Sequence, residues 1–344
     1  MRNFKKVLAS LVSVVLLAAV ASCLIMEPYL HSERFFYQDA RVREELAGQL
    51  DVITLGASNG MCAFDPSVMD RVLGCESYNV SVSMMPMAGR EFFLRLETGR
   101  NPIHTVIMDV SSETLVREEA AEHAEGDNFV FAQLSGMGQR LEYLTRYVPF
   151  DTWQDLYANV FSSSLRYWLT VLRGDTASDL DAAAKGFYGR DGRDISLNAE
   201  EARELHNTQY LDTPFREDSL ASLIRQIEYC RERGIRVVLA VCPKSDVELW
   251  ERDNLDLFRQ ELEEVAREYD CLLIDANLLK DRSSLWNDRE SFYDGDHMSA
   301  QGAQVFTEWF CSLLLEAEQG DISGYFYDTY QQAREASPYM AYLP

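Results

Sequence analysis

Two short polar segments, nearly the whole chain apart, carry the residue types of a serine nucleophile and its base. Ser58 lies in segment 56–59 (GASN), and Asp294 precedes His297 by three residues in segment 294–297 (DGDH). A serine hydroxyl is a weak nucleophile until a neighbouring base takes its proton, and a carboxylate on the far imidazole nitrogen fixes the tautomer of that base. The two segments together therefore predict a relay of Ser58, His297 and Asp294 that attacks an ester carbonyl carbon.

Each motif also has a structural interpretation. Ser58 could cap the helix that follows it, and His297 could bond Asp294 for structure alone. Asp296 is a second candidate partner for His297, although the side chains of adjacent residues usually diverge. The remaining histidines have no comparable carboxylate partner, and we expect structural or surface roles for His31, His104, His123 and His206.

Five short apolar runs, most of them separated by helical patterns, predict an α/β protein with a buried parallel sheet. The runs are 52–55, 78–82, 105–110, 237–241 and 272–274. Ser58 follows the first run closely, and a serine in such a turn presents its hydroxyl at the carboxyl edge of the sheet. Asp109 and Asp275 end two other runs, where we expect capping or turn roles.

The helices that must position these strands carry recognisable start signals. Asp65 and Pro66 form an N-cap and first-position pair for a helix that continues to Leu73. Ser299 is expected to cap the last helix of the domain. Further helices are predicted over 91–97, 218–233 and 247–269.

The pattern divides the chain into four parts. Residues 31–112 and 217–320 are expected to form the α/β domain. Residues 113–216 interrupt it and predict a mostly helical insertion, either above the active edge of the sheet or as a layer that only covers the core. Residues 321–344 carry five tyrosines and predict a tail packed on the domain.

Residues 1–30 have the composition of a membrane segment. Arg2, Lys5 and Lys6 precede Val7–Met26, a stretch of twenty residues without a charge. Twenty helical residues span about 30 Å, the thickness of the hydrocarbon core of a bilayer. The basic flank would stay in the cytoplasm and the rest of the chain would face outward. We expect an uncleaved anchor; a cleaved signal peptide and a lipoprotein signal at Cys23 are the alternatives.

Charge and cysteine content exclude some functions. The 344 residues include 56 acidic against 32 basic side chains, a net charge of −24, which would repel the phosphates of a nucleic acid. None of the seven cysteines forms a CxxC pair, and no Cys/His spacing suits zinc. Cys242 and Cys271 lie in apolar runs, so we expect buried thiols. No metal or organic cofactor is implied.

The combined motifs resemble the SGNH/GDSL hydrolase superfamily. They look most like its membrane-anchored, extracytoplasmic branch, which includes alginate O-acetylation proteins and the D-alanyl transfer protein of the teichoic-acid system. The resemblance covers about 50–110 and 218–317 and implies a flavodoxin-like α/β/α sandwich with a roughly five-stranded parallel sheet and acyl transfer to or from oxygen. It rests on segments 56–59, 64–66 (FDP), 78–81 (YNVS) and 294–297, and on Gly302.

The sequence departs from the family pattern in all three blocks that surround the nucleophile. Ala57 stands where the family often has Asp, and Ser81 replaces a glycine whose N–H stabilises the oxyanion. No Gly-x-Asn follows the run 105–110, so the third donor has no counterpart. The resemblance implies an oxyanion hole made by the N–H of Ser58, with help from Ser81 and Asn59. Loss of one donor costs roughly 100- to 1000-fold in rate.

These expectations favour an extracytoplasmic serine esterase or O-acyltransferase, with His297 as general base and Asp294 as its orienting carboxylate. By family analogy alone, the ester belongs to a cell-envelope glycan. The rival hypothesis is a non-catalytic accessory protein, whose anchor and aromatic insertion bind a membrane O-acyltransferase.

Overall fold

The computed structural model centres on a parallel five-stranded sheet in the order β2-β1-β3-β4-β5. It describes residues 13, 21–22, 24–30, 34–111, 115, 119–173, 184–198, 201, 216–251, 255–337 and 340. The carboxyl ends of the strands meet at one edge, and the strand order reverses between β1 and β3, where such sheets bind their ligands. The strands are β1 (Val52–Leu55), β2 (Ser77–Asn79), β3 (Thr105–Asp109), β4 (Arg236–Val241) and β5 (Leu272–Asp275).

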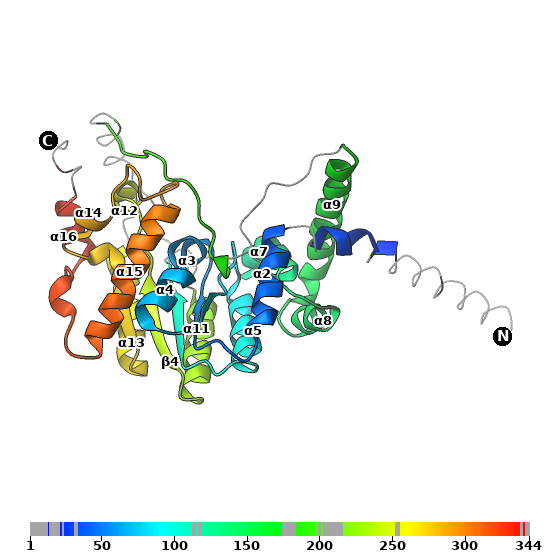
Figure 1. Cartoon of the computed structure of the whole chain (residues 1–344), viewed down its shortest axis with the longest axis horizontal. Coiled ribbons are helices and arrows are strands. Elements are labelled where there is room, and N and C mark those ends of the chain that lie inside the picture. Colours follow the sequence, from blue (N-terminus) through cyan, green and yellow to red (C-terminus); the bar gives the residue numbers. More distant parts are fainter. Residues whose placement is uncertain are drawn as a thin grey trace.

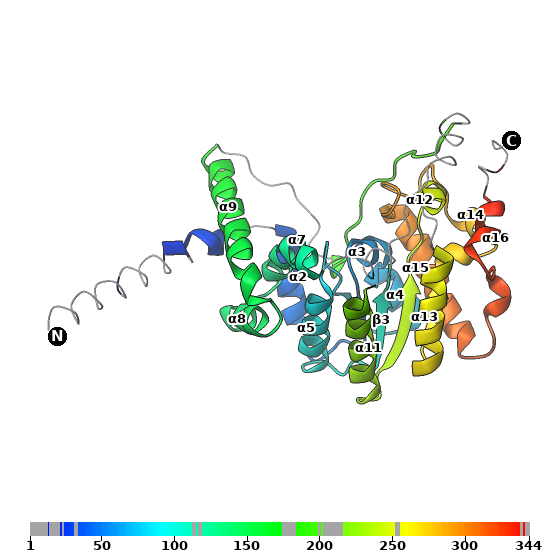
Figure 2. The same cartoon turned by 180° about the vertical axis from the view of Figure 1, so that it is seen from behind.

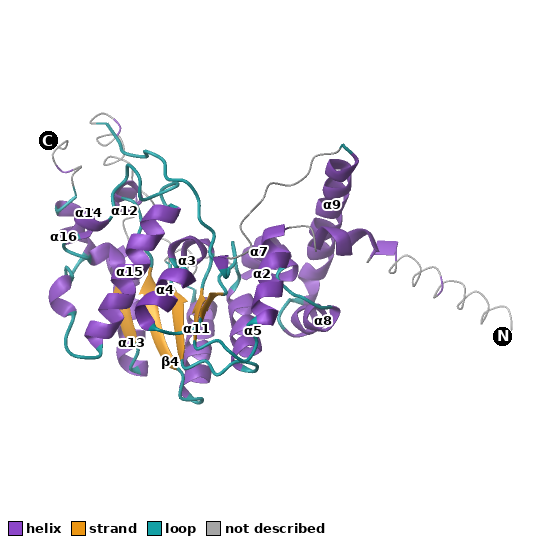
Figure 3. Ribbon diagram, viewed as in Figure 1, coloured by secondary structure: helices purple, strands orange, loops and turns teal. Residues whose placement is uncertain are grey.

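Helices cover both faces of the sheet, as Figure 3 shows with strands in orange and helices in purple. One face carries α3 (Ser58–Ala63), α4 (Pro66–Leu73) and α15 (Ala300–Ala317), which pack on one another. The opposite face carries α5 (Met87–Thr98), α11 (Glu217–Arg231) and α13 (Leu255–Tyr269), as Figures 1 and 2 show. Each face buries its own apolar core, so the predicted three-layer α/β/α class is confirmed.

The local predictions are mostly confirmed. Asp65 caps α4 by accepting a hydrogen bond from the N–H of Ser67, and Ser299 caps α15 by accepting one from Gly302. Where one long helix was predicted over 247–269, the structure describes two, α12 (Asp246–Glu251) and α13, and residues 252–254 between them lie outside the described residues. Helix α12 packs on α16 (Tyr330–Glu335), and α13 packs on β5, α11 and α16.

Between β3 and α11 the described residues form helices and no strand. These are α7 (Glu119–Ala132), α8 (Met137–Arg146), the short 3-10 turn η1 (Phe150–Thr152) and α9 (Trp153–Leu172). They lie beyond α5, together with α2 (Arg34–Glu45), on the side of the molecule away from α15 (Figures 1 and 2). Their apolar residues join the core beneath α5, so this part of the insertion covers the core.

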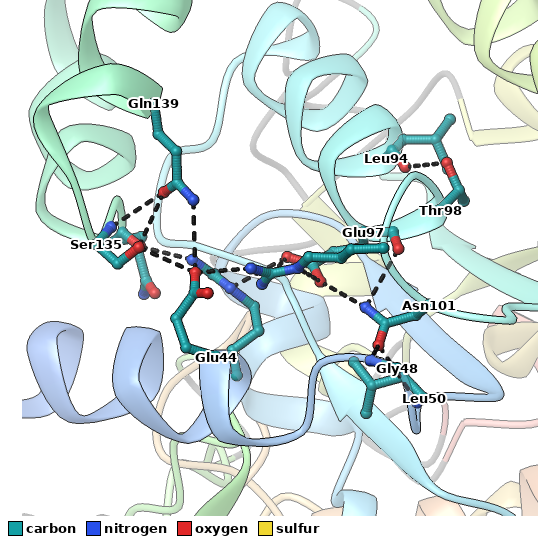
Figure 4. A network of polar contacts seen from close by, with 12 residues as sticks. Glu44, Gly48, Leu50, Leu94, Glu97, Thr98, Asn101, Ser135 and Gln139 are labelled. Carbon is teal, nitrogen blue, oxygen red and sulfur yellow. Dashed lines mark hydrogen bonds and ion pairs between the residues drawn. The ribbon is translucent and has the colours of Figure 1, made fainter.

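A buried ion-pair network attaches α2 to the sheet domain. Arg43 on α2 lies within 3.1 Å of Glu97 on α5, and both side chains are almost fully buried. Arg100 joins Glu97 to Glu44, and Glu44 accepts a hydrogen bond from Ser135, before α8 (Figure 4). A buried pair is costly to break, because removing one partner leaves the other charge without compensation. The network therefore fixes the helical region to α5.

Residues 184–198 form an extended strap across the carboxyl edge of the sheet. The carbonyl of Lys185 accepts a hydrogen bond from the N–H of Asn79, and Tyr188 donates to Met61 at the end of α3. Further along, Arg193 and Ile195 donate to the loop that precedes α15. The strap thus passes close to the segment that contains Ser58.

The chain after α15 packs on the domain over its described residues. It contains η4 (Ser323–Tyr325) and α16, and Tyr330 on α16 is buried with its hydroxyl donating to Asp275 at 2.7 Å. Asp275 also caps η3 (Ala276–Leu278), as expected, ahead of the short α14 (Arg282–Leu285). Most of residues 1–30, including Cys23, lie outside the described residues, as do His31 and His206. Within the described residues, no helix has the length and apolar character needed to cross a bilayer.

Candidate active site

Ser58, His297 and Asp294 form one continuous hydrogen-bond relay. Ser58 Oγ lies 2.8 Å from His297 Nε2, and His297 Nδ1 lies 2.8 Å from Asp294 Oδ1. The imidazole side chain is 26% exposed and the carboxylate 47%, so a substrate can reach the relay from solvent. The geometry brings together the three residues that the sequence placed at opposite ends of the chain.

The 294–297 loop shapes the relay through its own backbone. Asp294 Oδ1 accepts hydrogen bonds from the N–H groups of Asp296 and His297 as well as from the imidazole. Partial burial raises the pKa of Asp294, but the hydrogen bond and charge of His297, with the two N–H groups, outweigh this and hold its pKa below the ordinary value. The carboxylate is therefore favoured in its ionised form and accepts a hydrogen bond from the N–H at Nδ1 of His297.

The loop after β4 holds this segment against the sheet. The N–H of Ser245 donates to the carbonyl of Gly295 at 3.0 Å. The buried ammonium group of Lys244 donates to Asp296 Oδ1 at 2.6 Å. Asp296 is thus engaged by Lys244, and Asp294 is the carboxylate that contacts His297. The sequence search missed Lys244, which lies one residue past Cys242-Pro243 and carries no local motif.

The start of α3 is set by the close approach of Asp109 at the end of β3. A Cβ atom on Gly56 would lie 2.5 Å from Asp109 Cβ, and one on Gly60 would lie 2.9 Å from it. Asp109 Oδ2 accepts a hydrogen bond from the N–H of Gly60 at 3.0 Å. Two absent side chains thus let α3 sit on the end of β3, with Ser58 in its first turn. Segment 56–60 is a Gly-x-Ser-x-Gly pattern, which is typical of such strand-to-helix turns. The prediction of the nucleophile used only residues 56–59 and so did not include Gly60.

Asp109 is a fully buried carboxyl group beneath α3 rather than a turn cap. Burial raises its pKa, although the charge of Arg90 and the N–H of Gly60 oppose the shift. Arg90 is itself buried and donates from Nη1 to the carbonyl of Asp109 at 2.7 Å. Asp109 therefore has a structural role in this chain: its side chain supports α3 from below.

Asn79 at the end of β2 ties the nucleophile helix to the sheet. Its Nδ2 donates to the carbonyls of Gly60 and Phe64 at 2.9 Å each. Its Oδ1 accepts a hydrogen bond from the N–H of Ser81 at 3.1 Å. The Ser81 N–H is thus directed to Asn79 in this structure, and its role as an oxyanion donor stays a prediction. The N–H groups of Ser58 and Asn59 have no hydrogen-bond partner within the described residues.

Other side chains surround the relay without joining it. Cys62, one helical turn after Ser58, is buried, and this burial raises the pKa of its thiol to about 12, so it is no competing nucleophile. Arg190 from the strap lies over the rings of Tyr188 and Tyr293 at 4.5 Å each. Within the described residues the six cysteines are free; Cys75 and Cys271 are only partly buried, while the others are buried as expected.

The expectation that no other histidine has a carboxylate partner is wrong for His123. Its Nδ1 lies 3.0 Å from Asp127 Oδ2, four residues later on α7, and Asp127 Oδ1 accepts a hydrogen bond from Tyr143. All three side chains are buried, which agrees with the structural role predicted for this histidine. His104 is exposed.

Comparison with known proteins gives only distant structural similarity. No family model and no curated protein matches the sequence. A solved structure of a candidate lipolytic protein of the G-D-S-L family from Desulfitobacterium hafniense is 12% identical, with 77% of this chain and 99% of that chain covered and a TM-score of 0.38. A GDSL-like lipase from Bacteroides thetaiotaomicron is 10% identical, with coverage of 84% and 99% and a TM-score of 0.39. Similarity at these TM-scores does not indicate a function for this chain.

Proposed function

We propose that this chain is a serine esterase or O-acyltransferase. The observation that carries the proposal is the continuous relay from Ser58 through His297 to Asp294, with both hydrogen bonds at 2.8 Å. His297 Nε2 takes the hydroxyl proton as Ser58 Oγ bonds to the ester carbonyl carbon. The same proton then goes to the departing alcohol oxygen as its bond to the carbon breaks, which leaves an acyl group on Ser58.

The second half of the reaction uses the same groups in reverse. Water or a sugar hydroxyl gives its proton to His297 and attacks the acyl carbon, which releases Ser58. In both halves we propose that the N–H groups of Ser58 and Asn59, in the first turn of α3, bind the negative carbonyl oxygen. The proposal is supported by the fact that they donate to no other group within the described residues. The choice between water and a sugar acceptor decides between esterase and transferase.

The location belongs to the same proposal. The basic flank and the uncharged stretch Val7–Met26 support a membrane anchor with the catalytic domain outside the cytoplasm. An ester of a cell-envelope glycan is the substrate class proposed for a domain held there. The accessory-protein hypothesis remains the competitor, since it uses the same anchor and needs no acyl-enzyme.

The decisive experiment is labelling of the full chain in its native membrane with a fluorophosphonate probe. We expect the probe on the peptide that contains Ser58, no labelling of Ser58→Ala, and much slower labelling of His297→Ala. Ser323→Ala, at an exposed serine in η4, is the matched control and should label normally. A folded chain that takes up no probe at Ser58 refutes the enzyme proposal and favours the accessory protein.

A further inference from the structure

Helix α9 presents two apolar sides, and only one of them is covered. Its buried side consists of Leu156, Val160 and Ser164. A second stripe, spaced mostly by four residues, faces outward beside the first. Leu165 is 45% exposed, Leu169 52% and Leu172 79%. The whole stripe, called here the α9 stripe, consists of Tyr157, Phe161, Leu165, Trp168, Leu169 and Leu172.

The charge around the α9 stripe differs from that of the rest of the chain. The whole sequence has 56 acidic residues, and α9 contains one of them, Asp155 in its first turn, while residues 156–173 after it contain none. The charged residues in this stretch are Arg166 and Arg173, both cationic. A helix with an apolar side, interfacial aromatic rings and cationic side chains beyond its first turn is typical of one that lies in the headgroup region of a membrane. Cationic side chains there are attracted to anionic lipids.

The α9 stripe adjoins the end of the uncharged N-terminal stretch. Trp168 Nε1 donates to the carbonyl of Ile25 at 3.2 Å, and the hydroxyls of Ser22 and Tyr157 are 2.8 Å apart. A hollow of about 430 Å³, lined mainly by apolar side chains, lies between these residues and helices α7 to α9. Figures 1 and 2 show α9 running across the helical residues 24–30 rather than along them.

We propose that the α9 stripe is a second membrane-contact surface, which lies in the headgroup region of the bilayer that holds Val7–Met26. A helix that crosses the end of a spanning segment runs parallel to the membrane plane, at the depth where tryptophan and tyrosine are favoured. The inference rests on the proposed anchor and not on the chemistry of Ser58. It adds a fixed orientation: an anchor alone allows the domain to tilt and rotate, whereas anchor and stripe together hold it at one angle to the lipid.

The test uses the full chain in vesicles of phosphatidylcholine and phosphatidylglycerol, with and without bromine on the acyl chains. Bromine quenches the fluorescence only of tryptophans that contact the lipid. The emission of Trp168 is obtained by subtracting the spectrum of Trp168→Phe from that of the wild type. We expect the emission of Trp168 to be blue-shifted in vesicles without bromine and to be quenched in brominated vesicles. Trp309→Phe is the matched control, because Trp309 is a partly exposed residue on α15, across the sheet, and its emission should be unquenched.

Two further measurements separate the outcomes. Leu165→Glu with Leu169→Glu changes exposed positions only, and it should return the Trp168 emission to that of a water-exposed ring without lowering the melting temperature. A chain that floats with alkali-washed vesicles while Trp168 stays unquenched overturns the stripe proposal and leaves the anchor intact; the stripe would then be a protein-docking face. A chain that does not float overturns both. Fluorophosphonate labelling of Ser58 in the same vesicles tests the proposed serine chemistry independently of membrane contact.

Discussion

Replacing Asp294 with asparagine tests whether the relay works as a unit. The change keeps the size of the side chain and an oxygen that can accept the hydrogen bond from His297 Nδ1, which spans 2.8 Å in the structure. It removes the negative charge that stabilises the imidazolium formed when Ser58 gives up its proton. The variant should therefore fold normally but lose rate in the step that forms the acyl-enzyme.

The size of the loss follows from the exposure of the site. A carboxylate and an imidazolium whose centres are roughly 4 Å apart attract by about 4 kcal/mol at an effective dielectric constant near 20, and by about 1 kcal/mol in water. The Asp294 side chain is 47% exposed, so solvent screens it and an intermediate figure of about 2 kcal/mol is appropriate. That corresponds to about a 30-fold loss. A fully buried triad aspartate is worth about 10⁴-fold, so the loss here should be clearly smaller.

The assay is the rate of fluorophosphonate labelling, supported by hydrolysis of p-nitrophenyl acetate. We expect kcat to fall about 30-fold with little change in KM, because the charge acts mainly on the transition state. Asp321→Asn, at an exposed carboxylate remote from the relay, should leave both constants unchanged. A loss below about threefold for Asp294→Asn would show that the carboxylate does not assist His297, and the assignment of Asp294 as the orienting carboxylate would have to be abandoned.

Three further predictions follow from the support beneath α3. Gly60→Ala should destabilise the fold by about 1–3 kcal/mol and slow the labelling of Ser58, because the new methyl group meets Asp109; a melting curve equal to wild type would refute this contact. Asn79→Ala leaves the carbonyl of Phe64 and the N–H of Ser81 without their partners and should lower the unfolding free energy by about 2–4 kcal/mol in urea titrations, with an unchanged midpoint as the contradicting result. Burial raises the pKa of Asp109, so the unfolded chain loses this proton at lower pH than the folded one, and stability falls as the pH rises from about 4 through the folded pKa. Asp109→Asn should remove that slope: its melting temperature relative to wild type should rise between pH 4 and pH 8, and a constant difference would show that Asp109 is ionised over the whole range.

The parts of the fold that depend on local pattern could be predicted from the sequence. Strands β1, β3 and β4 are mostly apolar runs because they are buried on both faces, so their identification needed no tertiary information. Strand β2 (Ser77–Asn79) shares only Tyr78 and Asn79 with the run predicted over 78–82. The caps at Asp65 and Ser299 are likewise local, since each side chain bonds an N–H two or three residues later. Ser58 and His297 could be paired because parallel strands bring their carboxyl ends together at one edge.

The parts that depend on long-range contacts could not be predicted. Lys244 reaches Asp296, 52 residues away, and nothing in the neighbourhood of either residue indicates that pair. The packing of both α12 and α13 on α16, which lies far along the chain, likewise has no local signal. The partner of His123 is different, because Asp127 lies four residues later and helical spacing alone could have indicated it.

The hydrogen bonds around α3 limit which N–H groups are available to form an oxyanion hole. Of the N–H groups close to Ser58, that of Gly60 is bonded to Asp109 and that of Ser81 to Asn79. Both bonds support α3, so a substrate oxygen would compete with the helix that carries the nucleophile for these two donors. The N–H groups of Ser58 and Asn59 have no such duty within the described residues. Oxyanion stabilisation should therefore come from the first turn of α3. In this chain the N–H groups of Gly60 and Ser81, which could otherwise bind the substrate oxygen, hold the nucleophile helix in place.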